Sequence, residues 1–229
     1  MTRIYGLQKM TLLYFPGHVA CTVFLGGCDM RCPFCHNSEL VDGTAEPVMT
    51  EEELLLFLKR RQGLLEGVAV TGGEPLLREE NLELFRKIRA LDYPLKLDTN
   101  GTHPDRLRRV LKEDLAQYVA MDIKNSPERY AETIGLKSFN LSPVRESIAL
   151  LMEGDTDYEF RTTVTAELHD AESFRAIGTW ISGAKRYYLQ KFTDRETVPF
   201  QGFHAPDEKL LEDWIRIMRL YVGEADIRG

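Results

Sequence analysis

Residues 19–37 read VACTVFLGGCDMRCPFCHN: an apolar run of strand length, two glycines, and then Cys28, Cys32 and Cys35 at C-x3-C-x2-C spacing. No fourth cysteine follows them in the chain. An ordinary 4Fe-4S cluster takes four thiolates, and a structural zinc site is closed by four ligands. Three thiolates on a short loop therefore predict a cluster with one iron open to another ligand, and so a site for chemistry.

Two other interpretations of these cysteines are less consistent with the sequence. A zinc site could recruit His36 or Cys21 as its fourth ligand, but His36 directly follows Cys35, and adjacent residues rarely reach one tetrahedral ion without strain. Disulfides are not expected, because the chain shows no signal peptide and has only four cysteines in an acidic, Lys/Glu-rich composition. We expect reduced thiols, a cytoplasmic location, and a buried thiol at Cys21, which lies inside the apolar run.

The composition indicates one globular domain, residues 1–229. With 43% hydrophobic residues the chain can bury a large core, and no run of 18 apolar residues that could span a membrane occurs. The formal net charge of -7 argues against a nucleic-acid partner, since such proteins usually carry a dense basic face. Neither nucleic acid nor a membrane is therefore an expected partner.

Strand-length apolar runs alternate with amphipathic helical patterns, which is typical of βα units on a parallel sheet. The six predicted strands are Val19–Leu25, Gly67–Thr71, Leu95–Asp98, Tyr118–Asp122, Tyr158–Val164 and Arg186–Gln190. Thr50 and Glu53 predict a capping box at a helix start, and a last helix is expected from about Pro206 to Val222. Its apolar stripe indicates core packing more than partner docking. Six units are fewer than the eight of a closed barrel, so the predicted fold is α/β, an incomplete (β/α)6 TIM-like barrel.

Functional residues in parallel βα folds gather at the carboxyl ends of strands, and three predicted strands end in polar motifs. These motifs are Val70-Thr71-Gly72-Gly73-Glu74-Pro75, Asp98-Thr99-Asn100-Gly101 and Met121-Asp122-Ile123-Lys124. Gly72 and Gly73 would let the backbone approach a ligand closely, and Glu74 would add a negative partner. Taken singly, each motif has an ordinary explanation as a turn, a helix cap or a surface ion pair. Their joint occurrence at successive strand ends favours a binding site.

These motifs resemble the radical S-adenosylmethionine (SAM) superfamily, in particular its glycyl-radical-activating branch, and among these the activating proteins of anaerobic ribonucleoside-triphosphate reductase. The resemblance implies one 4Fe-4S cluster held by Cys28, Cys32 and Cys35, with SAM on the fourth iron. One electron from the cluster would cleave SAM to a 5'-deoxyadenosyl radical, which would abstract a hydrogen from a glycine of a partner enzyme. The resemblance also implies a lateral opening in the barrel through which a loop of that protein substrate enters.

The resemblance extends to residues expected to contact SAM. Besides Gly72, Gly73, Glu74 and Asn100, these are Phe34 against the adenine, Asp98 on hydroxyl or amino groups, and Gln190 near the adenosine. Lys124 would neutralise the carboxylate of SAM or that of Asp122, and Arg161 would meet either the SAM carboxylate or an internal Asp. Because neighbouring carboxylates repel each other, a monovalent cation near Asp98, Thr99 and Asp122 is a further hypothesis.

Features outside the motifs limit the expected number of clusters and the expected protein partners. Between Cys35 and Thr50 there is no further cysteine, so one cluster is expected, with its electron supplied by an external flavodoxin- or ferredoxin-like donor. Phe192 stands where some relatives have a histidine, and the segment before the first strand lacks an aspartate found in others, which argues against the pyruvate formate-lyase activator itself. The alternatives are an activase of another glycyl radical enzyme, a small-molecule enzyme such as a 7-carboxy-7-deazaguanine synthase, and a non-catalytic iron or zinc protein.

Overall fold

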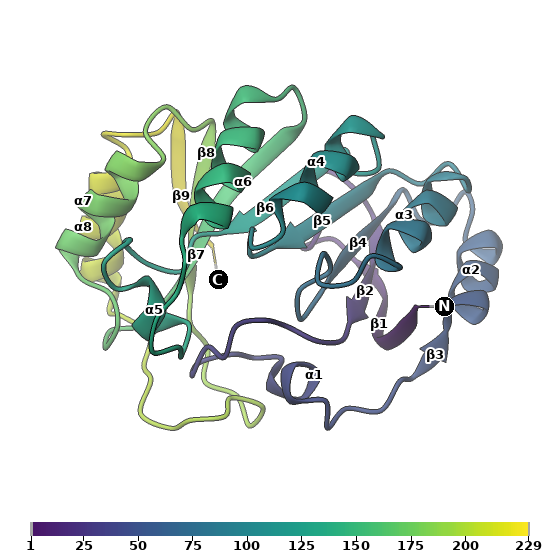
Figure 1. The fold of residues 1–229 in the computed structure, drawn as a ribbon, viewed down its shortest axis with the longest axis horizontal. Helices are drawn as coiled ribbons and strands as arrows, with labels where there is room; N and C mark the ends of the chain where they lie inside the picture. Colours follow the sequence, from purple (N-terminus) through teal and green to yellow (C-terminus); the bar gives the residue numbers. More distant parts are fainter. Residues whose placement is uncertain (1, 229) are drawn as a thin grey trace. The chain divides into compact units, whose positions relative to one another are not determined.

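The computed structural model describes residues 2–228, so Met1 and Gly229, the ends of the predicted domain, lie outside the described residues. The chain divides into two compact units. The first comprises the described residues up to Asp29, together with Glu39–Val119 and Asp155–Asp157; the second comprises Met30–Ser38, Ala120–Gly154 and the residues from Tyr158 onward. Figure 1 labels the elements of both units.

The first unit is built on a sheet in the order β3-β1-β2-β4-β5. The parallel strands are β2 (Ala20–Leu25), β4 (Gly67–Gly72) and β5 (Leu95–Thr99). The strand β1 (Arg3–Thr11) pairs antiparallel with β2, and the two-residue β3 (Met49–Thr50) pairs antiparallel with the start of β1. Because β2, β4 and β5 run in the same direction, their carboxyl ends lie at one edge of this sheet.

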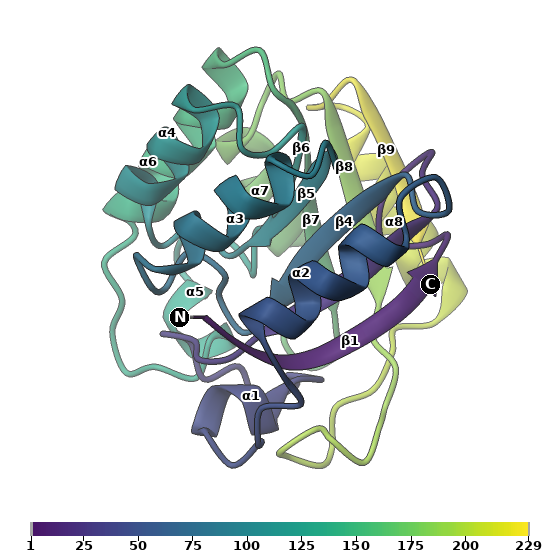
Figure 2. The same ribbon diagram turned by 90° about the vertical axis from the view of Figure 1, so that its right-hand side faces the viewer.

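Four helices follow the strands of this unit: α1 (Ser38–Asp42), α2 (Glu51–Arg60), α3 (Asn81–Arg89) and α4 (Pro104–Lys112). The predicted capping box is confirmed, because Glu53 N donates to Thr50 Oγ1 at 3.2 Å and Thr50 N donates to Glu53 Oε2 at 2.8 Å. Figure 2 shows α2 lying along the face of the sheet that contains β1 and β4. Leu54 and Leu58, one turn apart, form its buried stripe.

The second unit contains the strand order β6-β7-β8-β9, with β7, β8 and β9 parallel to one another. Its strands are β6 (Tyr118–Asp122, whose first two residues belong to the first unit), β7 (Asp157–Val164), β8 (Arg186–Lys191) and β9 (Glu224–Arg228). Its helices are α5 (Tyr130–Thr133), α6 (Ser142–Glu153), α7 (Ala171–Trp180) and α8 (Glu208–Met218). The rings of Phe174 on α7 and Trp214 on α8 stack at 4.9 Å, which joins these two helices.

All six predicted strands are present, each within one residue of its predicted bounds at either end. The last helix is shorter than predicted at both ends. Asp207 caps its start by accepting a hydrogen bond from Leu210 N at 2.8 Å, and Arg219 is the cap residue at its end. Its buried stripe consists of Leu211, Trp214, Ile215 and Met218, which confirms the expectation of core packing, whereas Leu210 is exposed. The strands β1, β3 and β9 were not predicted.

Cys21 is fully buried, as predicted, and burial raises the pKa of its thiol to about 12. None of the helices in residues 2–228 has both the length and the hydropathy needed to cross a lipid bilayer.

Candidate functional site

The Gly-Gly-Glu turn at the end of β4 packs directly against the backbone of the cysteine loop. Gly73 N donates to Leu25 O at 2.8 Å, and Glu74 N donates to Gly27 O at 2.7 Å. A Cβ atom on Gly73 would lie 2.0 Å from Gly27 O, and one on Gly72 would lie 2.3 Å from Leu25 O. Both glycines are therefore required for contact between two backbones. Since the N–H of Gly73 is used within the chain, the carbonyl oxygens of the turn are the groups to consider for a ligand.

Glu74 lies inside the first unit, with 1% of its surface exposed. Its Oε1 accepts hydrogen bonds from Leu76 N at 2.9 Å and from Thr99 Oγ1 at 2.8 Å, and its Oε2 accepts one from Asn100 N at 2.7 Å. Burial raises the pKa of Glu74 to about 7, although these three donors act in the opposite direction. The carboxylate of Glu74 thus joins the ends of β4 and β5, and its expected place beside SAM stays a prediction.

Asn100 follows β5 and is buried, and its amide contacts the cysteine loop. Its Oδ1 accepts hydrogen bonds from Thr102 N at 3.0 Å and Thr102 Oγ1 at 2.6 Å. Its Nδ2 donates to Asp29 Oδ1 at 3.0 Å and lies 3.7 Å from the sulfur of Cys28. The structure thus brings together Glu74, Asn100 and Cys28, which come from three loops of the first unit.

Asp98 has a cationic partner that the sequence analysis missed. Its Oδ1 pairs with Nζ of Lys96, and both side chains are buried. Residues i and i+2 of a strand point to the same face, so the sequence Leu95-Lys96-Leu97-Asp98 already contained this signal. The hydroxyl of Thr99 is also engaged, since it donates to Glu74 and accepts from Gly101 N at 3.1 Å.

Asp122, in the second unit, lies between two cations. Its Oδ2 is 2.7 Å from Lys124 Nζ, and its Oδ1 is 2.5 Å from Arg161 Nε. Burial disfavours the ionised form of Asp122, but the charges of Arg161 and Lys124 outweigh it and hold its pKa well below the usual range. Lys124 and Arg161 both contact the internal carboxylate of Asp122, and their contact with the carboxylate of SAM stays a prediction. The three charges sum to one positive charge.

Phe34 is packed into an aromatic cluster of the second unit and is 4% exposed. Its ring meets Phe192 edge-on at 6.4 Å and Phe203 at 6.0 Å. His36 stacks on Phe192, with the two ring centroids 5.3 Å apart. The Nε2 atom of His36 lies 2.6 Å from Thr193 O. Phe192 therefore orders the end of the cysteine loop, which a shorter or charged residue would do less well.

Gln190 lies on β8 opposite Thr163 of β7, and Thr163 Oγ1 lies 3.4 Å from Gln190 Oε1. A second residue missed by the sequence analysis, His169, is 3% exposed and places its Nε2 2.9 Å from Lys124 O, while its Nδ1 lies 3.2 Å from Thr165 N. The side chain of His169 thus connects the loop after β6 to the loop after β7. Nothing in its local sequence marks this role, because the contacts are formed only by the fold.

The family model of the radical SAM superfamily matches residues 22–168, which include the cysteine loop and the first five predicted strand ends. The chain belongs to the radical SAM superfamily. It is 25% identical over 236 residues to a protein of Methanocaldococcus jannaschii whose name assigns it provisionally to the glycyl-radical enzyme activating enzymes, with 98% of this chain and 95% of that protein covered. It is 32% identical over 130 residues to the pyruvate formate-lyase-activating enzyme of Clostridium pasteurianum, covering 55% of this chain and 53% of that enzyme.

The fold of this radical SAM protein is similar to solved structures of the superfamily. SuiB of Streptococcus suis, solved with bound S-adenosylmethionine, matches with a TM-score of 0.68 at 13% identity and covers 89% of this chain and 48% of its own. The predicted fold class, a partial TIM-like barrel of the radical SAM type, is thereby confirmed.

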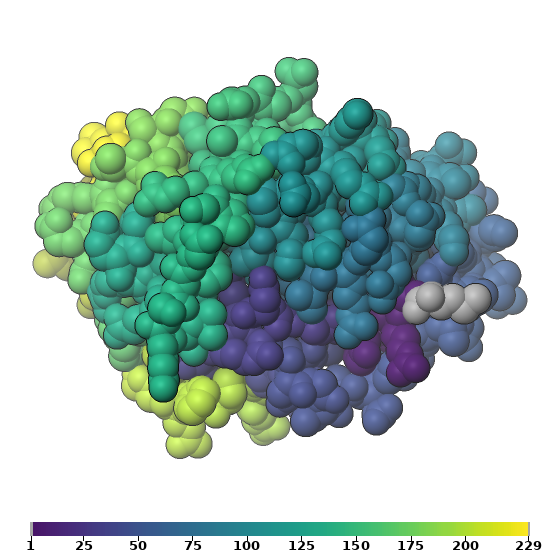
Figure 3. All heavy atoms as spheres, viewed as in Figure 1, coloured from purple at the N-terminus to yellow at the C-terminus, as the bar shows by residue number. Residues whose placement is uncertain are grey.

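Superfamily membership implies a 4Fe-4S cluster and SAM, and the thiols of this chain fit the cluster. Cys28, Cys32 and Cys35 form no disulfide and are partly exposed. The segment that contains them, dark blue in Figure 3, reaches the surface on the face drawn there. Within residues 2–228, no three or more Cys, His, Asp or Glu side chains gather closely enough to hold a single metal ion. A cluster takes its thiolates at separate irons, so its ligands need not converge on one point.

Two opposing influences act on the thiol of Cys32. Burial raises the pKa of the Cys32 thiol to about 11, while the nearby charge of Lys124 acts to lower it. Lys124 thus offers a positive charge to the second cysteine of the loop, in addition to its ion pair with Asp122.

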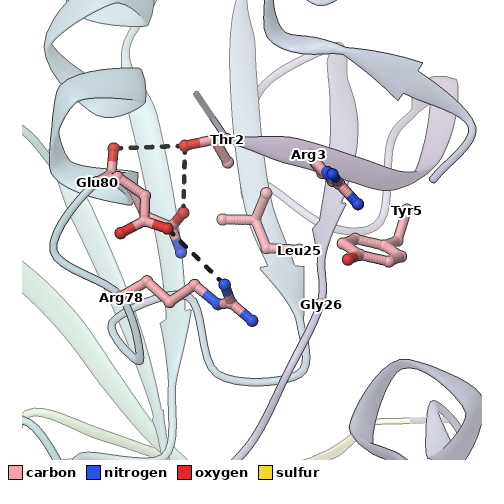
Figure 4. A pocket seen from close by; sticks show the side chains of 8 residues that line it. Thr2, Arg3, Tyr5, Leu25, Gly26, Arg78 and Glu80 are labelled. Atoms are coloured by element: carbon pink, nitrogen blue, oxygen red, sulfur yellow. Dashed lines mark hydrogen bonds and ion pairs between the residues drawn. The ribbon is translucent and has the colours of Figure 1, made fainter. Parts of the chain in front are cut away.

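A cavity of about 210 Å³ lies apart from these residues, between the start of β1, the end of β2 and the start of α3. It is lined by Thr2, Arg3, Tyr5, Leu25, Gly26, Arg78, Glu80 and Asn81. Figure 4 shows Arg3 and Arg78 on opposite sides of Leu25. The guanidinium of Arg78 lies 3.8 Å from the carboxylate of Glu80, so part of its charge is balanced locally. None of the predicted site residues lines this cavity.

Proposed function

We propose that this radical SAM enzyme, acting as a single domain, activates a glycyl radical enzyme, with anaerobic ribonucleoside-triphosphate reductase as the first candidate. Cys28, Cys32 and Cys35 would hold the cluster, whose role is to deliver one electron to SAM. The resulting 5'-deoxyadenosyl radical would take a hydrogen atom from a glycine Cα of the partner. The similarity over nearly the full length to the M. jannaschii protein supports an activase.

The observation that carries the proposal is the backbone joint between the Gly-Gly-Glu turn and the cysteine loop. Gly72 and Gly73 permit this contact because neither has a Cβ, and the two hydrogen bonds to Leu25 O and Gly27 O fix the distance between the loops. A ligand bound to the open iron would lie beside backbone carbonyl oxygens, which accept hydrogen bonds from an amino group. This arrangement suits the amino acid end of SAM.

The charged groups of the chain are consistent with this proposal. The group formed by Asp122, Lys124 and Arg161 has one excess positive charge and would attract the carboxylate of SAM. Asp98 and Lys96 together form a neutral pair. Since each aspartate has its own cation within the chain, charge balance alone does not require the predicted monovalent cation, which stays a prediction.

The electron would come from a separate flavodoxin- or ferredoxin-like protein. The chain has four cysteines, and the one outside the loop, Cys21, is fully buried in β2. A second cluster within the chain therefore lacks ligands. Positioning of the glycine and exclusion of water from the radical would then be the main contributions of the protein to catalysis.

The test is an anaerobic assay with the reconstituted, dithionite-reduced protein, SAM and two candidate partners, an anaerobic ribonucleotide reductase and a pyruvate formate-lyase. We expect 5'-deoxyadenosine by chromatography and a glycyl radical doublet by electron paramagnetic resonance on the first partner. Cys28→Ala should abolish both signals, whereas the matched control Cys21→Ala should retain them. Formation of 5'-deoxyadenosine without a radical on either partner would exclude both activase assignments and leave a small-molecule radical SAM enzyme.

A further inference from the structure

The side chain of Asn100 contacts the first cysteine of the loop. Its Nδ2 lies 3.7 Å from Cys28 Sγ, within the range of a hydrogen bond to sulfur, and only 6% of the residue is exposed. The same nitrogen donates to Asp29 Oδ1 at 3.0 Å. An amide nitrogen carries two hydrogens, so it can serve both acceptors at once.

The orientation of this amide is determined by its surroundings. Asn100 Oδ1 faces two donors of Thr102, the backbone N–H at 3.0 Å and the hydroxyl at 2.6 Å. If the amide were turned over, its NH2 group would face the N–H of Thr102 and its oxygen would face the carboxylate of Asp29, and both contacts would be repulsive. The NH2 group must therefore point toward Cys28.

The main chain of Asn100 is held as firmly as its side chain. Its backbone N–H donates to Glu74 Oε2 at 2.7 Å, and Glu74 is anchored in turn by Thr99 Oγ1. The Gly-Gly-Glu turn thus fixes the backbone of the residue whose side chain reaches the sulfur. Replacing only the side chain of Asn100 would leave this backbone bond in place.

A hydrogen bond to a ligating sulfur affects the reduction potential of an iron–sulfur cluster. Adding one electron makes the cluster more negative by one charge, so a donor directed at the sulfur stabilises the reduced form more than the oxidised form. The carboxylate of Asp29, whose Oδ1 is 3.9 Å from Cys28 Sγ, acts in the opposite direction. Asn100, whose Nδ2 donates to Asp29 Oδ1 at 3.0 Å, offsets part of that charge.

We propose that Asn100 is a positioning residue that donates a hydrogen bond to the sulfur of Cys28 and raises the midpoint potential of the cluster. This inference rests on the proposed function, since it needs a cluster on Cys28. Its consequence is that an external donor can reduce the cluster more readily than it could without Asn100.

The experiment is an electron paramagnetic resonance redox titration of the reconstituted protein in the absence of SAM. We expect Asn100→Ala to shift the midpoint to a more negative potential, with iron content and urea midpoint close to those of the parent protein. Asp29→Asn should shift it in the positive direction. Thr102→Val, which removes one of the two donors that orient the amide, should give a smaller negative shift and serves as the test if Asn100→Ala fails to fold.

The matched control is Asn140→Ala, which removes an exposed asparagine whose side chain accepts from Ser142 N at 3.0 Å. An unchanged midpoint in both Asn100→Ala and Thr102→Val, or an equal shift in Asn140→Ala, would overturn the inference. Failure of the parent protein to assemble a cluster or to cleave SAM would instead refute the proposed function, so the two failures are distinguishable.

Discussion

Asp122 depends on two cations, and each contributes a hydrogen-bonded ion pair of low solvent exposure. The side chains of Asp122, Lys124 and Arg161 are 20%, 16% and 12% exposed. In such surroundings the loss of one partner costs less than the loss of both, because the carboxylate stays ionised while one cation remains. The sequence had left open whether Lys124 and Arg161 serve SAM or an internal carboxylate, since the two choices need the same residue types.

For Arg161→Met we predict a loss of about 1–3 kcal/mol in the free energy of unfolding, as expected for a charged hydrogen bond. Lys124→Met should cost a similar amount. The double variant should lose more free energy of unfolding than the sum of the two single losses, because Asp122 then lacks both Lys124 and Arg161. Urea unfolding of the four proteins in a double-mutant cycle measures the coupling, and strictly additive losses would contradict a shared role of the two cations.

Glu74 gives a prediction for the pH dependence of stability. Its pKa is raised to about 7 by burial, against 4.5 in the unfolded chain, so the folded protein holds a proton that the unfolded chain has released over this interval. The free energy of unfolding should therefore fall as pH rises from about 4.5 to about 7, by about 3 kcal/mol in total. The difference between the parent protein and Glu74→Gln in urea unfolding at pH 5 and pH 7.5 isolates this slope. A difference that is constant with pH would contradict the prediction.

Contacts between individual side chains were the part of the structure that the sequence predicted least completely. Lys96 was not predicted as the partner of Asp98, although the spacing of the two residues predicts that they share one face of the strand. Asn100 was chosen for SAM, but its contact with Cys28 spans 72 residues of sequence, and only the parallel pairing of β2, β4 and β5 creates it. Spacing along a strand can be read from sequence, whereas contacts between loops depend on the register of several strands.

Among the elements, the buried strands were predictable and the edge strands were not. The six predicted strands are buried at most of their positions and rich in apolar residues, as expected for strands covered on both faces. In contrast, β1 is a mixed run that contains Gly6, and β9 has charged residues at three of its five positions. Edge strands of this composition resist unwanted pairing and lack the apolar pattern that marks a strand in sequence.

An ion pair within the second unit attaches the edge strand β9 to β7. Arg228 Nη1 lies 2.7 Å from Oε1 of Glu159, which is fully buried in β7, and the guanidinium lies over the ring of Tyr188 at 3.4 Å. We predict that Arg228→Ala lowers the free energy of unfolding by about 1–3 kcal/mol, because the buried carboxylate of Glu159 loses a charged hydrogen bond. The double variant Glu159→Leu/Arg228→Met should recover much of this loss in urea unfolding, and a double variant as unstable as Arg228→Ala would contradict the explanation.

The joint between β4 and the cysteine loop gives a second prediction about elements. Gly73→Ala places a Cβ against Gly27 O, so one of the two backbones must move. We expect lower stability and less iron per chain after reconstitution. The control is Gly17→Ala, at φ +76° with nothing within 4 Å of the added Cβ, which should cost about 1 kcal/mol and leave the iron content unchanged. Normal iron content in Gly73→Ala would show that the joint is not needed for the cluster.

For the whole molecule, the cysteine count limits the redox chemistry. With three loop thiols available we expect about four irons per chain after reconstitution, and their removal by a chelator should abolish SAM cleavage. Iron analysis and the visible absorption spectrum measure this directly. A reconstituted protein with about eight irons would contradict a single cluster, and one with stoichiometric zinc would favour the non-catalytic alternative.

The burial of Cys21 has a practical use in such work. An alkylating reagent applied to the folded protein should modify the three partly exposed loop cysteines and spare Cys21, whose thiol is fully covered. The mass of the intact chain after labelling would then count the cluster ligands that are still empty. Each preparation would thus report its own fraction of assembled sites, molecule by molecule, without any assay of the reaction.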